Sequence, residues 1–116
     1  MGDEHIRLHA ISARIQVLAG DTIVADTCNV LELRESGYPP RYYIARADVA
    51  MDRLCRSTTR THCPYKGDAS YYALTLDGKC IEDVAWSYEQ PLPAVAKIRN
   101  RLAFDPQRVE LRITER

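Results

Sequence analysis

The sequence predicts a mainly β fold of the α+β type, with antiparallel strands and one or two short helices. Three observations carry this prediction. Several short segments alternate apolar and polar residues with a period of two. Turns containing glycine, of the kind that close β-hairpins, separate these segments. One further segment has a clear helical pattern. With 116 residues and 46% apolar side chains, we expect a single domain over residues 1–116 with one hydrophobic core.

The N-terminal part of the chain indicates a run of strands. In residues 10–18, Ile11, Ile15 and the residues that alternate with them place their apolar side chains on one face, as in a half-buried strand. Gly20 and Asp21 form the expected tip of the first hairpin. Gly37 and two consecutive prolines then interrupt regular structure. The expected strands of this part are 10–18, 22–27, 29–35 and 41–44.

The next segment, "ARADVAMDRLCRS" at residues 45–57, is the strongest helix signal. It is rich in residues that favour helices, and Met51 and Leu54 fall on one helical face. Beyond it, Asp77 and Gly78 should close a second hairpin. The remaining expected elements are strands at 71–76, 80–89 and 105–115 and a short helix or turn at 94–102.

Composition excludes several classes of function. A net charge of zero argues against a protein whose main task is to hold nucleic acid by bulk electrostatics. No apolar run approaches the ~20 residues of a membrane span. The N-terminus shows no hydrophobic segment typical of a signal peptide. We therefore expect a cytoplasmic protein that contacts neither nucleic acid nor membrane and keeps its thiols reduced.

The four cysteines predict no metal site. They are widely spaced, without the C-x-x-C pairs that most zinc sites use. We expect Cys28, Cys55 and Cys80 to be small buried residues, because free cysteine packs as a small apolar side chain. No metal and no other cofactor is expected.

The densest group of reactive side chains is "TRTHCPYKGDASYY", residues 59–72, which we expect to form a structured loop and the start of the strand at 71–76. Lys66 and Gly67 would present an ammonium and an open backbone N–H to an anion. The residue spacing of a P-loop is absent. Cys63 has His62 beside it and Lys66 three residues on, and a nearby cation lowers the pKa of a thiol. Two interpretations of Cys63 therefore remain: a catalytic thiol, or a structural cysteine in a turn.

Aromatic residues on the neighbouring strand indicate a pocket beside this loop. Trp86 and Tyr88 share one strand face, and Tyr71 lies on the strand expected to pair with theirs. Aromatic walls with a few polar groups are typical of small-ligand sites, although a purely structural aromatic cluster has the same signature. Asp68 and Asp83 are expected to be solvated acids and not a catalytic pair.

Four blocks of the chain resemble, in order, blocks of the bacterial "domain of unknown function 427" family. They are "VADT", "GYPPRYYIARADV", "STTRTHCPYKGDASYYAL" and "DVAWSYEQPLPAVAKIRNRLAF", and the resemblance covers about residues 14–110. It implies a compact fold of antiparallel sheets of the β-tent type, shared with methionine sulfoxide reductase B and the thalidomide-binding domain of cereblon. Many such relatives hold structural zinc with two C-x-x-C pairs, which this chain lacks. Ala45 and Ala47 depart from the family pattern.

We consider three functions. In the first, a small polar or anionic ligand binds between loop 60–71 and the strand of Trp86. In the second, Cys63 is the nucleophile or redox thiol of a thiol-dependent enzyme. In the third, the protein is an interaction module that uses exposed strand edges or Tyr38, Tyr42 and Tyr43. The candidate ligand-binding residues are Thr61, Lys66, Gly67, Tyr71, Trp86, Tyr88 and Pro91.

Overall fold

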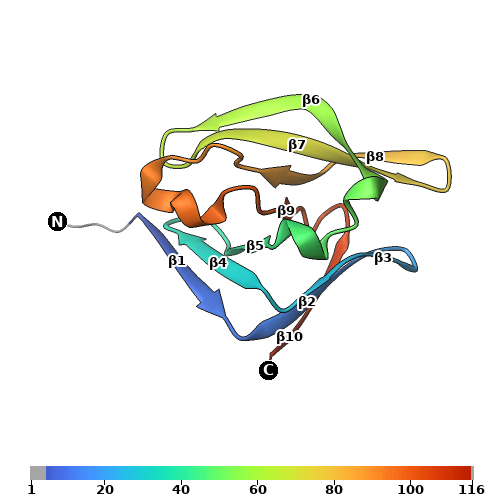
Figure 1. Ribbon diagram of the computed structural model, residues 1–116, viewed down its shortest axis with the longest axis horizontal. Coiled ribbons are helices and arrows are strands. Elements are labelled where there is room, and N and C mark those ends of the chain that lie inside the picture. The colour runs from blue at the N-terminus through green and yellow to red at the C-terminus, as the bar shows by residue number, and fades with distance from the viewer. Residues whose placement is uncertain (1–4, 116) are drawn as a thin grey trace.

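The computed structural model describes residues 5–115 and is built mainly from β-strands (Figure 1). Three short 3-10 helices are the only helical elements in this range, which confirms the predicted fold class. The strands are β1 (Ile6–Ile11), β2 (Ala13–Ala19), β3 (Thr22–Thr27), β4 (Val30–Glu35), β5 (Arg41–Ile44), β6 (Leu54–Cys63), β7 (Gly67–Leu76), β8 (Lys79–Ser87), β9 (Ala103–Phe104) and β10 (Glu110–Glu115). The helices are η1 (Arg46–Asp48), η2 (Met51–Arg53) and η3 (Pro93–Ile98).

The strands form three antiparallel sheets that face one another. Their strand orders are β1-β4-β5, β10-β2-β3 and β6-β7-β8-β9. In Figure 1, β6, β7 and β8 form the upper layer, while β1, β4, β2 and β3 form the lower one. An isolated bridge between Ile44 of β5 and Leu102 beside β9 ties the layers together, with N···O distances of 2.9 and 3.0 Å.

The buried side chains gather in two clusters, one toward each end of the space between the layers. The first cluster includes Ile15, Leu74 and Val84 and joins β2 to β7 and β8. The second includes Leu33 and Ile98 and lies between β4, β5, η3 and the start of β7. Burial of apolar area of this kind is the main favourable contribution to folding. The second cluster also holds the side chains that form the floor of the pocket described below.

The helix expected over residues 45–57 is wrong. The structure has two single turns, η1 and η2, and from Leu54 onward the chain is strand β6. Between the turns, Val49 is extended and bridges Ala25 of β3, and the Ala50 N–H donates to the Val24 carbonyl at 2.8 Å. Pairing with β3 and then with β7 overrides a local helix preference worth only a fraction of a kcal/mol per residue.

The loop expected within residues 59–72 is also wrong. This stretch is the β6–β7 hairpin, in which Cys63 pairs with Gly67 around a turn at residues 64–66. β6 is the edge strand of its sheet, so water reaches much of it and its sequence stays polar. A polar edge strand of this kind has no clear apolar alternation to identify it. Strand β1 was not expected as a separate strand, although its last two residues fall in the strand expected over 10–18.

Several local predictions are confirmed. Turns lie at Gly20–Asp21 and Asp77–Gly78, and η3 overlaps the short helix or turn expected at 94–102. The expected burial of Cys28, Cys55 and Cys80 is wrong, because all three are exposed. They lie in a turn, on the β6 edge and beside the tip of the β7–β8 hairpin, where no layer covers them. None of the helices in the described range is long and apolar enough to cross a membrane.

Candidate functional site

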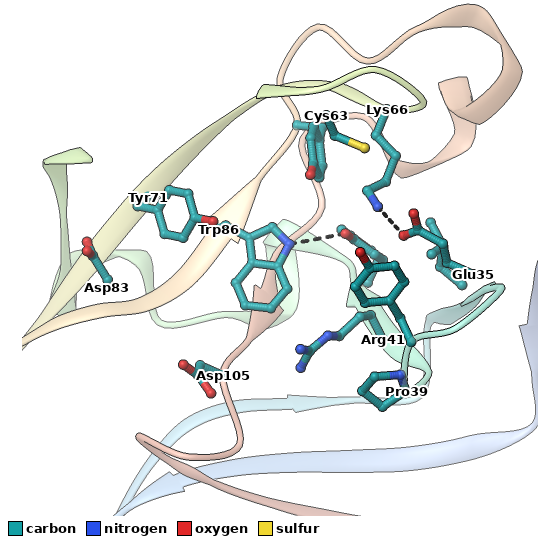
Figure 2. A pocket seen from close by; sticks show the side chains of 13 residues that line it. Glu35, Pro39, Arg41, Cys63, Lys66, Tyr71, Asp83, Trp86 and Asp105 are labelled. Atoms are coloured by element: carbon teal, nitrogen blue, oxygen red, sulfur yellow. Dashed lines mark hydrogen bonds and ion pairs between the residues drawn. The ribbon is translucent and has the colours of Figure 1, made fainter. Parts of the chain in front are cut away.

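A pocket of about 380 Å³ lies where the sheet of β4 and β5 faces the sheet of β7 and β8. Figure 2 shows Trp86 at its centre, with Lys66 and Glu35 at one end and Asp105 at the other. Both sheets contribute side chains, so neither sheet makes the pocket alone. The lining residues are Leu33, Glu35, Tyr38, Pro39, Arg41, Tyr43, Cys63, Lys66, Tyr71, Asp83, Trp86, Tyr88 and Asp105.

The aromatic wall follows from the alternation of side chains along β7. Successive strand residues point to opposite faces of a sheet. Ala69 and Tyr71 pack with the pocket cluster, while Tyr72 packs with the other cluster. Tyr71 pairs with Trp86 of β8, and their ring centroids lie 6.1 Å apart in a tilted arrangement. We call the side of β7 that carries Ala69 and Tyr71 the pocket face.

A buried ion pair closes one end of the pocket. Lys66 Nζ lies 2.6 Å from Glu35 Oε1, and the two side chains are only 10% and 12% exposed. His5 Nε2 lies 3.2 Å from the other carboxylate oxygen of Glu35. A residue outside the 64–66 turn helps to hold it, because the Leu92 N–H donates to the Lys66 carbonyl at 3.0 Å. The charge of Lys66 is therefore already neutralised, which differs from the open lysine expected from the sequence.

Two tyrosines hold uncharged hydroxyls inside the pocket. The Trp86 indole N–H donates to the Tyr43 hydroxyl oxygen at 3.1 Å. Burial raises the pKa of Tyr43 well above its usual value, and burial likewise raises the pKa of Tyr88. Both phenols therefore stay protonated at physiological pH and offer neutral hydrogen-bonding groups.

Arg41 supplies the pocket's unpaired charge. Its guanidinium carbon lies 5.3 Å from the centroid of the Trp86 ring, a cation–π distance. The Arg41 guanidinium makes no hydrogen bond or ion pair with any residue in the 5–115 range. In Figure 2 its side chain points into the space below Trp86. The guanidinium thus keeps its donors available to a bound molecule.

The two pocket aspartates are held by neighbouring side chains. Asp83 accepts hydrogen bonds from the hydroxyls of Ser57 and Thr59, each at 2.8 Å. Asp105 lies 3.6 Å from Arg108. Asp68 is elsewhere: its carboxylate lies 2.7 Å from His62 Nδ1. Asp68 and Asp83 therefore do not form a catalytic carboxylate pair, as the sequence predicted.

The structure brings together five of the eight candidate residues at the pocket wall, namely Cys63, Lys66, Tyr71, Trp86 and Tyr88. Thr61 does not line the pocket, but it pairs with Ala69 across the strands, and its hydroxyl lies 3.2 Å from the Tyr71 hydroxyl. Gly67 and Pro91 pack against each other behind the turn. A Cβ on Gly67 would lie 3.3 Å from the Gln90 carbonyl oxygen and 3.6 Å from Pro91 Cα. A direct role in ligand binding or catalysis stays a prediction for all eight candidate residues.

The thiol of Cys63 lines the pocket without a basic partner from His62. The two residues are consecutive in β6, so their side chains point to opposite faces of the sheet. His62 is exposed and bonded to Asp68, while Lys66 is bonded to Glu35. Cys63 as a nucleophile stays a prediction. Within the described residues, no three His, Cys, Asp or Glu side chains meet in a way that would hold a metal ion.

Sequence reasoning missed the wall built by β4 and β5. Glu35 and Arg41 were not singled out, because neither lies near the aromatic strands in the sequence. Tyr43 was one of the residues that the interaction-module alternative placed on an exposed surface, but it is buried and only 1% exposed. The sequence feature that could have indicated this wall is the run "GYPPRYYI", in which a single arginine lies among aromatic residues and prolines. Long-range contacts, among them the bridge between Ile44 and Leu102 and the Trp86–Tyr43 hydrogen bond, bring this run opposite Trp86.

Comparison with known proteins supports the resemblance in the sequence. No curated protein matches the chain. A family model described as a domain of unknown function (DUF427) matches residues 7–115, nearly the whole length. The match covers β2 to β10, all of β1 except its first residue, and every residue of the pocket. The chain therefore belongs to the DUF427 family.

Proposed function

We propose that the protein binds a small polar ligand bearing an anionic group, in the pocket between β4–β5 and β7–β8. The anionic group lies against Arg41, and a flat part of the ligand packs beside Trp86 and Tyr71. This arrangement has the features of small-ligand sites, in which apolar and aromatic walls surround a few fixed polar groups.

The observation that carries the proposal is the free guanidinium of Arg41 against the Trp86 ring. A guanidinium offers five N–H donors in a plane, suited to a carboxylate or phosphate. The aromatic ring against the guanidinium holds the arginine side chain in place, while its N–H donors stay exposed. An arginine needed only for stability would be expected to pair with one of the two pocket aspartates, and Arg41 pairs with neither.

The Lys66–Glu35 pair gives the pocket a second, charge-balanced polar end. Because the pair is internally compensated, it favours a neutral polar group of the ligand over a further anion. Lys66 contributes donors and Glu35 contributes acceptors. The ligand that fits best has its anionic group at the Arg41 end and a hydrogen-bonding neutral group at the Lys66 end.

Trp86 is the only tryptophan in the chain and lies in the pocket, so its fluorescence reports occupancy directly. We would titrate the protein with a panel of aromatic and aliphatic carboxylates, each paired with its neutral amide. The expected result is a saturable change in Trp86 emission with carboxylates and not with amides. Arg41→Gln should weaken binding by about tenfold or more, the loss expected for a charged hydrogen-bonding partner.

The matched control is Arg112→Gln, which removes the same charge from β10, where Arg112 pairs with Glu110 on the surface. It should bind like the wild type. Equal affinity of Arg41→Gln and Arg112→Gln would contradict the proposal. A thiol-dependent enzyme would instead show Cys63→Ser losing turnover of a bound compound, and an interaction module would show no response to any small molecule.

A further inference from the structure

On the opposite side of β7, two arginines bind one carboxylate and a third arginine lies on the same face. Arg56 Nη2 lies 2.8 Å from each carboxylate oxygen of Glu89, and Arg46 Nη2 lies 3.5 Å from one of them. The Tyr72 hydroxyl donates to Glu89 at 2.6 Å. We call this surface the arginine face; it comprises Arg46, Arg56, Arg60, Ser70, Tyr72 and Glu89.

The strand register assembles the arginine face. Arg56 is the cross-strand partner of Tyr72, and Arg60 is the partner of Ser70. These residues therefore share the side of the sheet that points away from the pocket. Arg46 reaches the same place from η1, and its guanidinium carbon, like that of Arg56, lies 5.7 Å from the Tyr72 ring centroid. A buried tyrosine thus holds two guanidiniums in fixed positions.

The charges on the arginine face do not balance. Arg60 Nη1 contacts only the Ser70 hydroxyl, at 3.5 Å, and has no carboxylate partner among residues 5–115. Two guanidiniums, those of Arg46 and Arg56, therefore share the single carboxylate of Glu89, and the third, that of Arg60, has none. A cavity of about 250 Å³ opens beside Arg60, Ser70 and Glu89. Asp68 also borders this cavity, but its carboxylate is bonded to His62.

We propose that the arginine face is a binding site for a phosphate monoester dianion, which takes the place of the Glu89 carboxylate. A phosphate monoester carries nearly two negative charges and three acceptor oxygens at neutral pH. It therefore matches the unsatisfied donors of three arginines better than one carboxylate does. Arginine is suited to this role, because its planar fork binds phosphate oxygens in pairs.

The position of Glu89 allows its side chain to move away from the arginines. Glu89 follows β8 in a bend at residues 89–90, outside the strand ladder, and its side chain is 26% exposed. Its displacement breaks no backbone pairing between strands. Ser70 and Ser87 remain as hydroxyl groups beside Arg56 and Arg46. The Glu89 carboxylate occupies the position that the phosphate takes.

The test is an NMR titration of the 15N-labelled protein with N-acetyl-phosphoserine amide, with N-acetyl-serine amide as the uncharged control. The arginine Nε–H signals report the arginine face, and the Trp86 indole N–H reports the pocket on the other side. We expect saturable shifts of the Arg56 and Arg60 signals with the phosphate ester alone. The Trp86 indole should not shift, so this site is separable from the proposed pocket function.

Three variants sharpen the test. Arg60→Gln removes a side chain with only one long contact, so the fold should be kept, and affinity should fall by about tenfold. Arg53→Gln, an exposed arginine of η2 away from this cavity, is the matched control and should bind like the wild type. Glu89→Gln should bind more tightly, because the competing charge is gone. Equal affinities of the two arginine variants, weaker binding by Glu89→Gln, or no shift of arginine signals would overturn the proposal.

Discussion

The two faces of β7 use charge in opposite ways. On the pocket face, Lys66 is neutralised by Glu35, and both side chains are almost fully buried. On the arginine face, Glu89 is shared by more cations than it can neutralise, and the side chains are about a quarter to a half exposed. Tyr71 and Tyr72, one position apart on β7, therefore face a compensated interior and an uncompensated surface.

This difference separates a structural charge pair from a recognition surface. A buried ion pair must be balanced, because an unpaired charge in a low-dielectric interior costs several kcal/mol. A partly solvated cluster tolerates excess charge, since water and salt screen it. Charge that remains unpaired is consequently found where a ligand can reach it: Arg41 at the pocket wall and Arg60 on the arginine face.

The sharpest test of the comparison is to remove one carboxylate from each face. Glu35→Gln leaves Lys66 buried without its counter-charge, so we expect a loss of about 3 kcal/mol in the free energy of unfolding. Glu89→Gln leaves partly solvated arginines, and we expect a loss of about 1 kcal/mol or less. Urea denaturation of both variants and the wild type measures this difference. Equal losses would mean that the two faces do not differ in this way.

A smaller effect is expected at the turn that positions Lys66. Gly67 has a φ of +112°, and an added Cβ would press on the Gln90 carbonyl oxygen at 3.3 Å. We expect Gly67→Ala to cost about 2 kcal/mol, from backbone strain plus this contact.

Gly78 provides the matched control for Gly67. It also has a positive φ, +78°, but an added Cβ would meet nothing within 4 Å. Gly78→Ala should therefore cost about 1 kcal/mol, the strain alone. Thermal unfolding of both variants gives the comparison. If the two glycines cost the same, the 90–92 segment does not hold the Lys66 turn in place.

The sequence predicted the fold class because most strands carry period-two alternation and clear hairpin turns. It failed where a local pattern was overridden or absent. Residues 45–57 favour a helix locally, but bridging to β3 and pairing with β7 made them two turns and a strand. The edge strand β6 is polar, so its pattern gave no strand signal. Both failures arise from long-range pairing, which a local window does not contain.

The candidate site was predicted on one wall and missed on the other. Tyr71 and Trp86 were paired correctly, because a clear hairpin turn at Asp77–Gly78 links their strands. Arg41 and Glu35 come from strands far away in the sequence from Tyr71 and Trp86. No local sequence pattern shows that these strands lie close together in the fold. Similarly, His62 and Cys63 looked like a reactive pair, yet adjacency in a strand sends their side chains to opposite faces.

The smallest expected effect is a pH dependence that belongs to the arginine face. Burial on its own raises the pKa of Glu89, but the hydrogen bonds from Tyr72 and Arg56, with the charges of Arg56 and Arg46, outweigh it. The net pKa is below the ordinary value of 4.5. A lowered pKa in the folded state means stability that is fully present above the unfolded pKa and lost as pH falls through the folded pKa.

This dependence is measured as the difference in unfolding free energy between wild type and Glu89→Gln. The other carboxylates are the same in both proteins, so their titration cancels in the difference. We expect the wild type to be the more stable at about pH 7 and the gap to close as the pH falls below about 4.5. A gap that stays constant with pH would show that the arginines do not hold Glu89 as a carboxylate. The arginine face would then not be expected to bind a phosphate at the position that the Glu89 carboxylate occupies.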